Sequence, residues 1–253
     1  MGGPAAIVGV GYTRYGRLPE FDAYELGLWA LKEACRQQRV WRDEYGVDVM
    51  VAVNLSARQL SDPDVVERVR VAVLRQGVDP RRIKLEITES LLVDDMRMAI
   101  DVLSRLRALG LRLSIDDFGT GYSSLSRLGE LPIDEIKIDK FFVDGIGKEG
   151  TRETILNAAI AMGHGLGLTV VAEGVETHEQ LSYLRAHQCD YTQGFLLSRP
   201  VPAEDALDLL RRRLEPPAGV PVQRDTDGDA ADVAVPQVLP SLAPRPSKRL
   251  FAR

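Results

Sequence analysis

The sequence predicts an α/β fold that forms most of a (β/α)8 barrel. Short runs rich in β-branched and aromatic residues alternate with longer stretches in which apolar residues recur every three or four positions. This alternation indicates βαβ units and therefore a parallel sheet. In addition, a polar or charged residue occurs at or near the C-terminal end of each predicted strand, and in a barrel those ends meet at one mouth.

The expected elements follow one another regularly between about residues 25 and 214. Six strands are expected at 49–56, 83–90, 111–118, 135–142, 168–175 and 189–197. Helical periodicity occupies 24–41, 64–76, 95–110, 151–167 and 178–188. Several of these helices end at glycine, the residue that most readily adopts a left-handed C-cap. Periodicity alone leaves an open, doubly wound sheet as the alternative to a barrel.

The polar residues at the strand ends favour the barrel. They are Asn54, Glu86, Asp116, Asp117, Lys137, Glu173 and Gln193. In an open sheet they would spread along an edge tens of ångströms wide, because neighbouring strands lie about 4.8 Å apart. A barrel brings all of them to one mouth.

These residue types are suited to hard divalent cations. Glu86, Asp116, Asp117 and Glu173 with the amide oxygen of Asn54 form an all-oxygen ligand set, which suits Mg²⁺ or Mn²⁺ rather than zinc. Side chains alternate along a strand, so the adjacent pair Asp116 and Asp117 can face one site only where the strand is ending. Two cations held there would activate a water molecule and stabilise the leaving oxygen of a phosphodiester.

Two further points bear on this chemistry. Lys137 adds a cation that could orient the nucleophile or offset charge in the transition state.

Acidic residues at strand ends are also common N-caps of the following helix. Capping accounts well for one such residue, but poorly for four carboxylates, an asparagine and a lysine on successive strand ends.

Six sequence motifs in order resemble those of the EAL domain family. They are NLSARQL (54–60), LEITES (85–90), IDDFGTGYSSL (115–125), IDEIKIDKFFV (133–143), VVAEGVET (170–177) and QGFLLSRP (193–200). The resemblance covers about residues 25–214. It implies a TIM-like (β/α)8 barrel of EAL type that hydrolyses the bacterial second messenger cyclic di-GMP to pGpG with Mg²⁺ or Mn²⁺.

The resemblance also assigns metal ligands. Asn54, Glu86 and Asp116 would bind the first metal ion. Asp116, Asp117 and Glu173 would surround the second. Asp116 is thus expected to serve both ions.

The remaining roles implied by the resemblance concern the water molecule, the substrate and the supporting residues. Lys137 would hold the attacking water, and Glu173 is a candidate base. Gln193 would lie near a guanine of the substrate. Glu89 would stabilise the DDFGTGYSS loop. Glu176 would lie next to the metal ligands without binding a metal ion itself.

The N-terminal segment departs from the family. The first two strands of an EAL domain carry a Gln-Pro-Ile-type segment and then Glu-Ala-Leu followed by an arginine, the glutamate being a metal ligand. Residues 1–24 contain neither; instead PAAIVGVGYTRYGR resembles the opening strand and loop of thiolase-like proteins. We therefore expect a barrel that is incomplete at its N-terminus, in which AAIVGV fills one of two vacant strand positions, and phosphodiesterase turnover that is impaired or absent.

Three functional hypotheses follow. The first is an active cyclic di-GMP phosphodiesterase, which requires another acidic group in place of the Glu-Ala-Leu glutamate. The second is a non-catalytic signalling module that binds cyclic di-GMP or a protein. The third is a remnant that folds poorly and has no activity. The resemblance also makes a homodimer, paired near the DDFGTGYSS segment, a candidate assembly.

Composition sets the remaining expectations. Residues 215–253 hold seven of the 14 prolines, so we expect a disordered tail. The net charge of −5 argues against a DNA-binding surface, and no apolar run approaches the roughly 18 residues that span a membrane. No secretory signal is recognisable, and Cys35 and Cys189 are expected to be reduced, buried thiols of a cytoplasmic protein.

Overall fold

In the described part of the chain, seven parallel strands form a single curled sheet. The computed structural model describes residues 6–7, 23–89, 96–119, 128–148 and 150–214. The strands are β1 (Ala6–Ile7), β2 (Val51–Asn54), β3 (Ile83–Thr88), β4 (Arg112–Phe118), β5 (Glu135–Ile138), β6 (Thr169–Ala172) and β7 (Tyr191–Gln193). Their order in the sheet is β1-β7-β6-β5-β4-β3-β2. All six neighbouring pairs are parallel.

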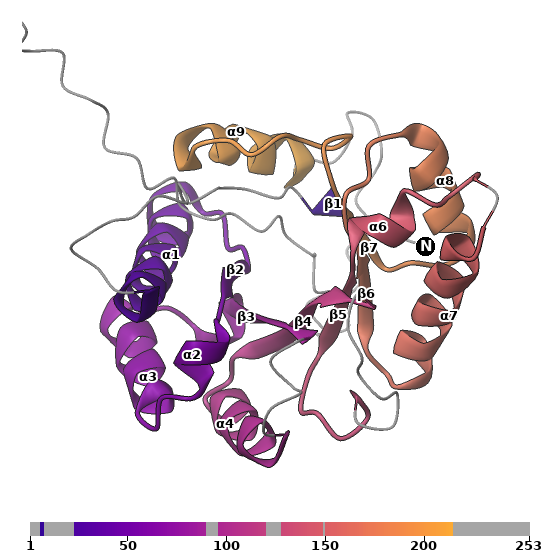
Figure 1. Ribbon diagram of the computed structural model, residues 1–253. Helices are drawn as coiled ribbons and strands as arrows, with labels where there is room; N and C mark the ends of the chain where they lie inside the picture. The colour runs from indigo at the N-terminus through magenta and orange to yellow at the C-terminus, as the bar shows by residue number, and fades with distance from the viewer. Residues whose placement is uncertain (1–5, 8–22, 90–95, 120–127, 149, 215–253) are drawn as a thin grey trace, which may run out of the picture.

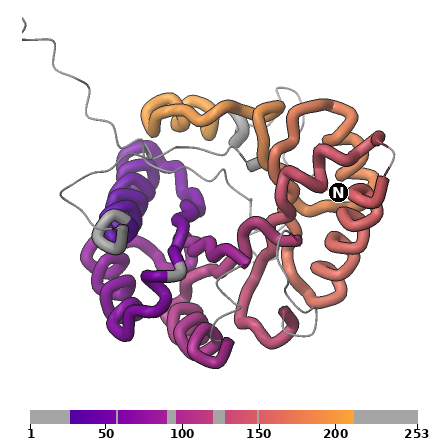
Figure 2. Tube along the Cα trace, viewed as in Figure 1, coloured from indigo at the N-terminus to yellow at the C-terminus, as the bar shows by residue number. Residues whose placement is uncertain are grey.

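The helices lie on the outside of this curl (Figure 1). They are α1 (Ala23–Tyr45), α2 (Ala57–Leu60), α3 (Val65–Gln76), α4 (Met96–Ala108), α6 (Lys140–Val143), α7 (Arg152–Gly165), α8 (His178–Ala186) and α9 (Ala203–Leu214), with a 3-10 turn η1 at Pro80–Arg82. The chain trace closes most of a ring (Figure 2). The structure therefore confirms the predicted fold, an incomplete barrel of parallel strands with helices around it.

Strand β1 explains how the N-terminal segment joins the sheet. Ala6 is the register partner of Thr192, and Ile7 is that of Gln193, so β1 extends the sheet beyond β7. Among the described residues β1 and β2 are the two ends of the sheet order. Of the AAIVGV segment, the described residues Ala6 and Ile7 occupy one strand position beside β7, and the remaining residues of the segment lie outside the described residues. Within the described residues the sheet does not close between β1 and β2.

The strand expected at 135–142 was too long. It ends at Ile138, and α6 begins two residues later. Asp139 has an extended backbone, and its side chain accepts a hydrogen bond from Phe141 N at 2.8 Å, which caps the short helix. The apolar run that follows Lys140 looks like a strand in sequence, but the cap redirects the backbone before the sheet can continue.

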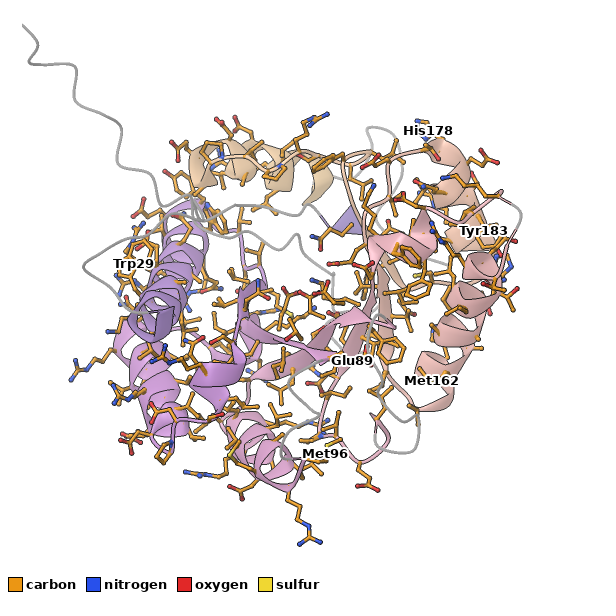
Figure 3. All side chains as sticks on the ribbon, in the orientation of Figure 1. Trp29, Glu89, Met96, Met162, His178 and Tyr183 are labelled. Atoms are coloured by element: carbon orange, nitrogen blue, oxygen red, sulfur yellow. The ribbon has the colours of Figure 1, made fainter. Side chains whose placement is uncertain are left out.

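The two faces of the central strands differ in polarity. Residues that face the helices are apolar and almost fully buried, namely Ile83, Leu85, Ile87, Leu113, Ile115, Ile136 and Ile138. The alternate positions on β3, β4 and β5 are polar or charged and point into the curl, where side chains fill the enclosed space (Figure 3). This alternation is that of a strand with one apolar and one polar face.

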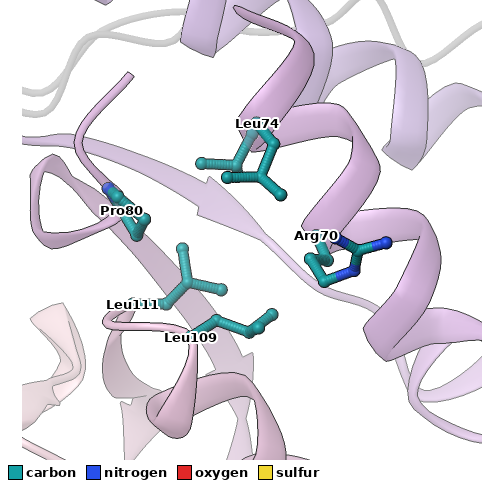
Figure 4. Close-up of a pocket in the computed structure, with 6 residues that line it drawn as sticks. Arg70, Leu74, Pro80, Leu109 and Leu111 are labelled. Carbon is teal, nitrogen blue, oxygen red and sulfur yellow. The ribbon is translucent and has the colours of Figure 1, made fainter. Parts of the chain in front are cut away.

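An apolar pocket lies between α3 and the segments that precede β3 and β4 (Figure 4). It is lined by Arg70, Val73, Leu74, Pro80, Leu109 and Leu111. Pro80 precedes β3 and Leu111 precedes β4, so this pocket is at the N-terminal ends of the strands. The predicted site residues are at the opposite, C-terminal ends.

Both cysteines are buried free thiols, as the sequence predicts. Burial raises the pKa of each, Cys35 and Cys189, to about 12, so neither thiol ionises near neutral pH. In the part of the chain that the structure describes, helices long and apolar enough to cross a bilayer do not occur.

Candidate functional site

The C-terminal ends of the strands gather the predicted residues. Asn54 ends β2, Glu86 lies in β3, Asp116 and Asp117 lie in β4, Lys137 lies in β5, Glu173 directly follows β6, and Gln193 ends β7. Parallel strands end at the same edge of a sheet, and the curl turns that edge into a mouth. Four of these residues, Glu86, Asp116, Lys137 and Glu173, form direct ion pairs.

Lys137 is the centre of the cluster. Its Nζ lies 2.6 Å from Glu173 Oε1, 2.9 Å from Asp116 Oδ1 and 3.1 Å from Glu86 Oε1, and its side chain is 3% exposed. Burial acts to lower the pKa of the Lys137 ammonium, but the three carboxylates outweigh burial and hold the pKa well above its ordinary value. Lys137 is therefore a permanent cation inside the mouth.

The carboxylates of this cluster outnumber the cation. Burial raises the pKa of Glu173 to about 7, although Lys137 opposes this shift. Burial also raises the pKa of Glu86, again against Lys137. Glu86 Oε1 lies 3.1 Å from Lys137 Nζ, yet this atom makes no aligned hydrogen bond within the described residues. The cluster is thus short of positive charge, which a metal ion would supply.

Three carboxylates are spaced to hold one cation. Oxygen atoms of Asp116, Asp117 and Glu173 all lie within 4.8 Å of one another. The adjacent aspartates come together because Asp117 has a φ of 55°, in the left-handed region that aspartate tolerates better than most residues. The pairing of β4 with β5 shifts register at this point, between Ile115 and Phe118.

The geometry at Asp117 adds to the sequence interpretation. The strand was expected to end at residue 118, and β4 does end at Phe118, one residue after the two aspartates. The positive φ of Asp117 and the shift of register within the last residues of the strand supply the change of direction. Such irregularities commonly re-aim side chains beside active sites.

Asn54 ends β2, which is four strands away from β6 in the sheet order. It is the register partner of Glu86, and its side chain is exposed. Its backbone neighbour Leu55 donates to Glu86 O at 2.8 Å, which fixes the end of β2 against β3. An exposed amide oxygen beside a buried carboxylate is available as a ligand.

Glu89 is well placed to support the loop after β4. It is 4% exposed, and its Oε2 accepts a hydrogen bond from Gly119 N at 2.9 Å. Residues 120–124 of the DDFGTGYSS segment lie outside the described residues. Glu89 therefore holds the first residue of that loop at the mouth.

Glu176 and Gln193 differ in burial. Glu176 is on the surface, where its Oε1 accepts a hydrogen bond from Lys140 Nζ at 2.6 Å. Gln193 Oε1 is buried and has no hydrogen-bond partner among the described residues. A buried amide oxygen without a partner is available to a ligand donor.

Sequence reasoning missed Asp139. Burial raises the pKa of Asp117, and the negative charges of Asp116 and Asp139 add to this effect. Asp139 therefore faces Asp117 in addition to capping α6. Its place one residue after β5, beside the other strand-end carboxylates, was a signal for this position.

Replacing Gly194 by alanine is expected to destabilise the chain strongly. Gly194 has a φ of 157°, and a Cβ atom there would lie 2.2 Å from both Val175 N and Val175 O. Backbone atoms cannot yield to such a contact, so we expect a loss of at least about 2 kcal/mol in the free energy of unfolding. Urea unfolding measures this loss, and Gly167→Ala is the control, because it shares a positive φ but its Cβ meets nothing within 4 Å. Equal losses in the two variants would contradict the steric explanation.

Comparison with known proteins agrees with this geometry. A sequence model of the EAL domain matches residues 23–200. MucR of Pseudomonas aeruginosa, a bifunctional diguanylate cyclase/cyclic di-GMP phosphodiesterase, is 45% identical over 183 residues, which are 72% of this chain and 27% of MucR. The chain thus spans about a quarter of that relative's length.

Two solved structures share the fold. PaMucR phosphodiesterase in complex with c-di-GMP has a TM-score of 0.71 and 39% identity, covering 80% of this chain and 91% of that structure. BlrP1 of Klebsiella pneumoniae in a manganese/cy-diGMP complex has a TM-score of 0.64 and 34% identity, covering 72% of this chain and 47% of that one. From the match over residues 23–200 and the curled sheet that carries the predicted motifs, this chain belongs to the EAL domain family.

Proposed function

We propose that this chain is a cyclic di-GMP phosphodiesterase domain that hydrolyses cyclic di-GMP to pGpG with Mg²⁺ or Mn²⁺. The observation that carries the proposal is the buried cluster in which Lys137 contacts Glu86, Asp116 and Glu173. A structural role alone does not explain three carboxylates around one ammonium, because burial of excess negative charge is costly. We take residues 25–214 as the extent of the domain.

The proposed metal ligands are the strand-end oxygens. Asn54, Glu86 and Asp116 would hold one cation, and Asp116, Asp117 and Glu173 the other. Support comes from Glu86 Oε1, which pairs with Lys137 Nζ at 3.1 Å but makes no aligned hydrogen bond within the described residues, and from the 4.8 Å grouping of Asp116, Asp117 and Glu173. Bound cations of this class supply an activated water and stabilise charge on a phosphodiester.

The other side chains would orient the reactants. Lys137 can hold the attacking water, since it is a buried, permanently charged donor. Glu173, with a pKa raised to about 7 by burial, is suited to accept the proton of that water near neutral pH. Gln193 offers Oε1, which has no hydrogen-bond partner among the described residues, to a guanine of the substrate. Glu89 holds the start of the loop after β4 through Gly119 N. Glu176 orders the outer edge of the mouth through its pairing with Lys140.

Turnover is expected to be slow. The printed sequence has no Glu-Ala-Leu segment, so the ligand that the family places there has no counterpart at that position. Loss of one anionic ligand weakens metal binding and with it catalysis. The second candidate function is therefore binding of cyclic di-GMP without hydrolysis, through the same mouth.

An assay of pGpG release separates these functions. The purified 253-residue chain is incubated with cyclic di-GMP and Mg²⁺ or Mn²⁺, and products are resolved by chromatography. We expect slow pGpG formation that Asp116→Asn abolishes, because Asp116 is shared between both proposed metals. Asp101→Asn is the control, since Asp101 is a surface residue of α4 whose side chain is 68% exposed.

The outcomes distinguish the two candidates. Hydrolysis that survives Asp116→Asn would contradict the proposed site. Binding of cyclic di-GMP in equilibrium dialysis without any pGpG would select the non-catalytic module.

We also propose a homodimer as the assembly, which light scattering of the purified chain tests.

A further inference from the structure

A second ion pair lies inside the curl, on the polar face of the same strands. Lys84 Nζ of β3 is 2.6 Å from Glu135 Oε2 of β5, and the two side chains are 10% and 6% exposed. Ser114 of β4, which is fully buried, donates from Oγ to Glu135 Oε1 at 3.0 Å. We call Lys84, Ser114 and Glu135 the lower layer.

The lower layer matches the residues of the mouth strand by strand. Each of its members precedes a mouth residue by two positions: Lys84 precedes Glu86, Ser114 precedes Asp116 and Glu135 precedes Lys137. Residues two apart in a strand lie on one face, about 6.6–6.8 Å from each other. The mouth residues Glu86, Asp116 and Lys137 therefore form an upper layer directly above the lower one.

The charges alternate between the layers. On β3 the positive Lys84 lies below the negative Glu86. On β5 the negative Glu135 lies below the positive Lys137. The charged neighbours along β3 and along β5 are thus of opposite sign, as are the groups paired across the curl, whereas Glu86 and Asp116 of the upper layer are both carboxylates. Because these groups are buried, solvent screens their interactions little.

In both layers, the ion pair connects β3 with β5 across the intervening strand β4. β3 and β5 are separated by β4 in the sheet, so in a flat sheet their axes would be about 9.6 Å apart. The curl and the length of the lysine side chains bring the paired groups together above Ser114 and Asp116. The curl of the sheet therefore determines both the Lys84–Glu135 pair and the Glu86–Lys137 pair.

Stability alone does not account for the lower pair. Replacing a buried ion pair with apolar residues of similar volume is often neutral or stabilising. A specific arrangement of charge beneath a catalytic layer gives the pair a role that apolar residues would not fulfil.

We propose that Lys84 and Glu135 are positioning residues, which fix the Glu86 carboxylate on the β3 side of the mouth and the Lys137 ammonium on the β5 side. The role rests on the proposed function, because it acts through a proposed metal ligand and the proposed water-holding lysine. Reversing the lower pair would place like charges above one another on both strands and push Glu86 and Lys137 apart.

The double variant Lys84→Glu/Glu135→Lys tests this role. It conserves net charge and the ability to form the lower ion pair. In a crystal structure of the metal-free variant, we expect Lys137 Nζ to lie more than about 4 Å from Glu86, the limit of an ion pair. In calorimetric titration with Mn²⁺ alone, we expect about tenfold weaker binding than in the unmodified chain.

The control reverses an ion pair that is far from the mouth. Arg82→Asp/Asp48→Arg inverts a pair whose partners lie 3.0 Å apart before β2 and β3, and it should leave Mn²⁺ binding unchanged. If the reversed lower pair does not fold, Lys84→Met/Glu135→Met replaces it, because matched apolar side chains preserve packing. We expect that variant to fold and, because the lower charges no longer hold Glu86 and Lys137 in place, to bind Mn²⁺ more weakly than the unmodified chain.

Two results would overturn the inference. One is an unchanged Glu86–Lys137 contact in the crystal structure, and the other is Mn²⁺ binding that is equal or tighter in the reversed variant. Failure of the unmodified chain to take up Mn²⁺ would instead count against the proposed function, and the metal-free crystal structure would still decide the positioning role.

Discussion

Lys137→Met is expected to lower the free energy of unfolding of the metal-free chain by about 3–5 kcal/mol, the usual effect of removing one partner from a buried ion pair. The ammonium contacts three carboxylates and is 3% exposed, so solvent cannot replace it. Methionine retains most of the volume of the lysine stem, which confines the effect to charge. Urea unfolding at constant pH measures the loss.

A divalent cation should reverse much of this loss. With Lys137 absent, Glu86, Asp116 and Glu173 lack their shared cation, so we expect Mn²⁺ to raise the unfolding temperature more in the variant than in the unmodified chain. Lys140→Met is the matched control. Its ammonium pairs with Glu176 at the surface, with side chains 43% and 45% exposed, and such pairs contribute at most about 1 kcal/mol. Equal stability of the two lysine variants would show that Lys137 does not hold the cluster together.

Affinity for Mn²⁺ is expected to rise at least about tenfold for each pH unit from 5 to 7 and less steeply above pH 7. The reason is that the Glu173 carboxyl, whose pKa burial raises to about 7, must lose its proton before it can bind a cation. Burial raises the pKa of Glu86 as well, which adds to the slope. Titration calorimetry in buffers of different ionisation enthalpy would also detect the released protons.

The same carboxyls affect folding in the opposite direction. Because their pKa values are higher in the folded chain than in the unfolded chain, their contribution to stability is fully present below about pH 4.5. The contribution of Glu173 to stability is lost as pH rises through about 7. Stability from this carboxyl therefore falls over the same pH range in which its affinity for metal rises. Glu173→Gln should flatten the pH dependence of Mn²⁺ affinity. An affinity independent of pH in the unmodified chain would contradict the raised pKa.

Local patterns in the sequence were sufficient to predict the sheet and its polar edge. Strands β3 and β4 fall within the predicted runs because apolar and polar residues alternate at the period of a strand. The positions of Asn54 and Glu86 at or near the C-terminal ends of their strands followed from these assignments, whereas β7 ends at Gln193, earlier than the predicted run at 189–197. The boundary at α6 was wrong, because Asp139 ends the strand through a hydrogen bond that an apolar run does not reveal.

By itself, the sequence determined the parallel strands, the polar end of the sheet and the family, because each depends on residues close together in the chain. The tertiary structure decided what depends on the curl. It brought β3 and β5 together across β4, which made Lys84–Glu135 and Glu86–Lys137 two stacked pairs, and it set the left-handed turn at Asp117. Periodicity assigns a side chain to a face, but only the curvature of the sheet decides which distant strand supplies its partner.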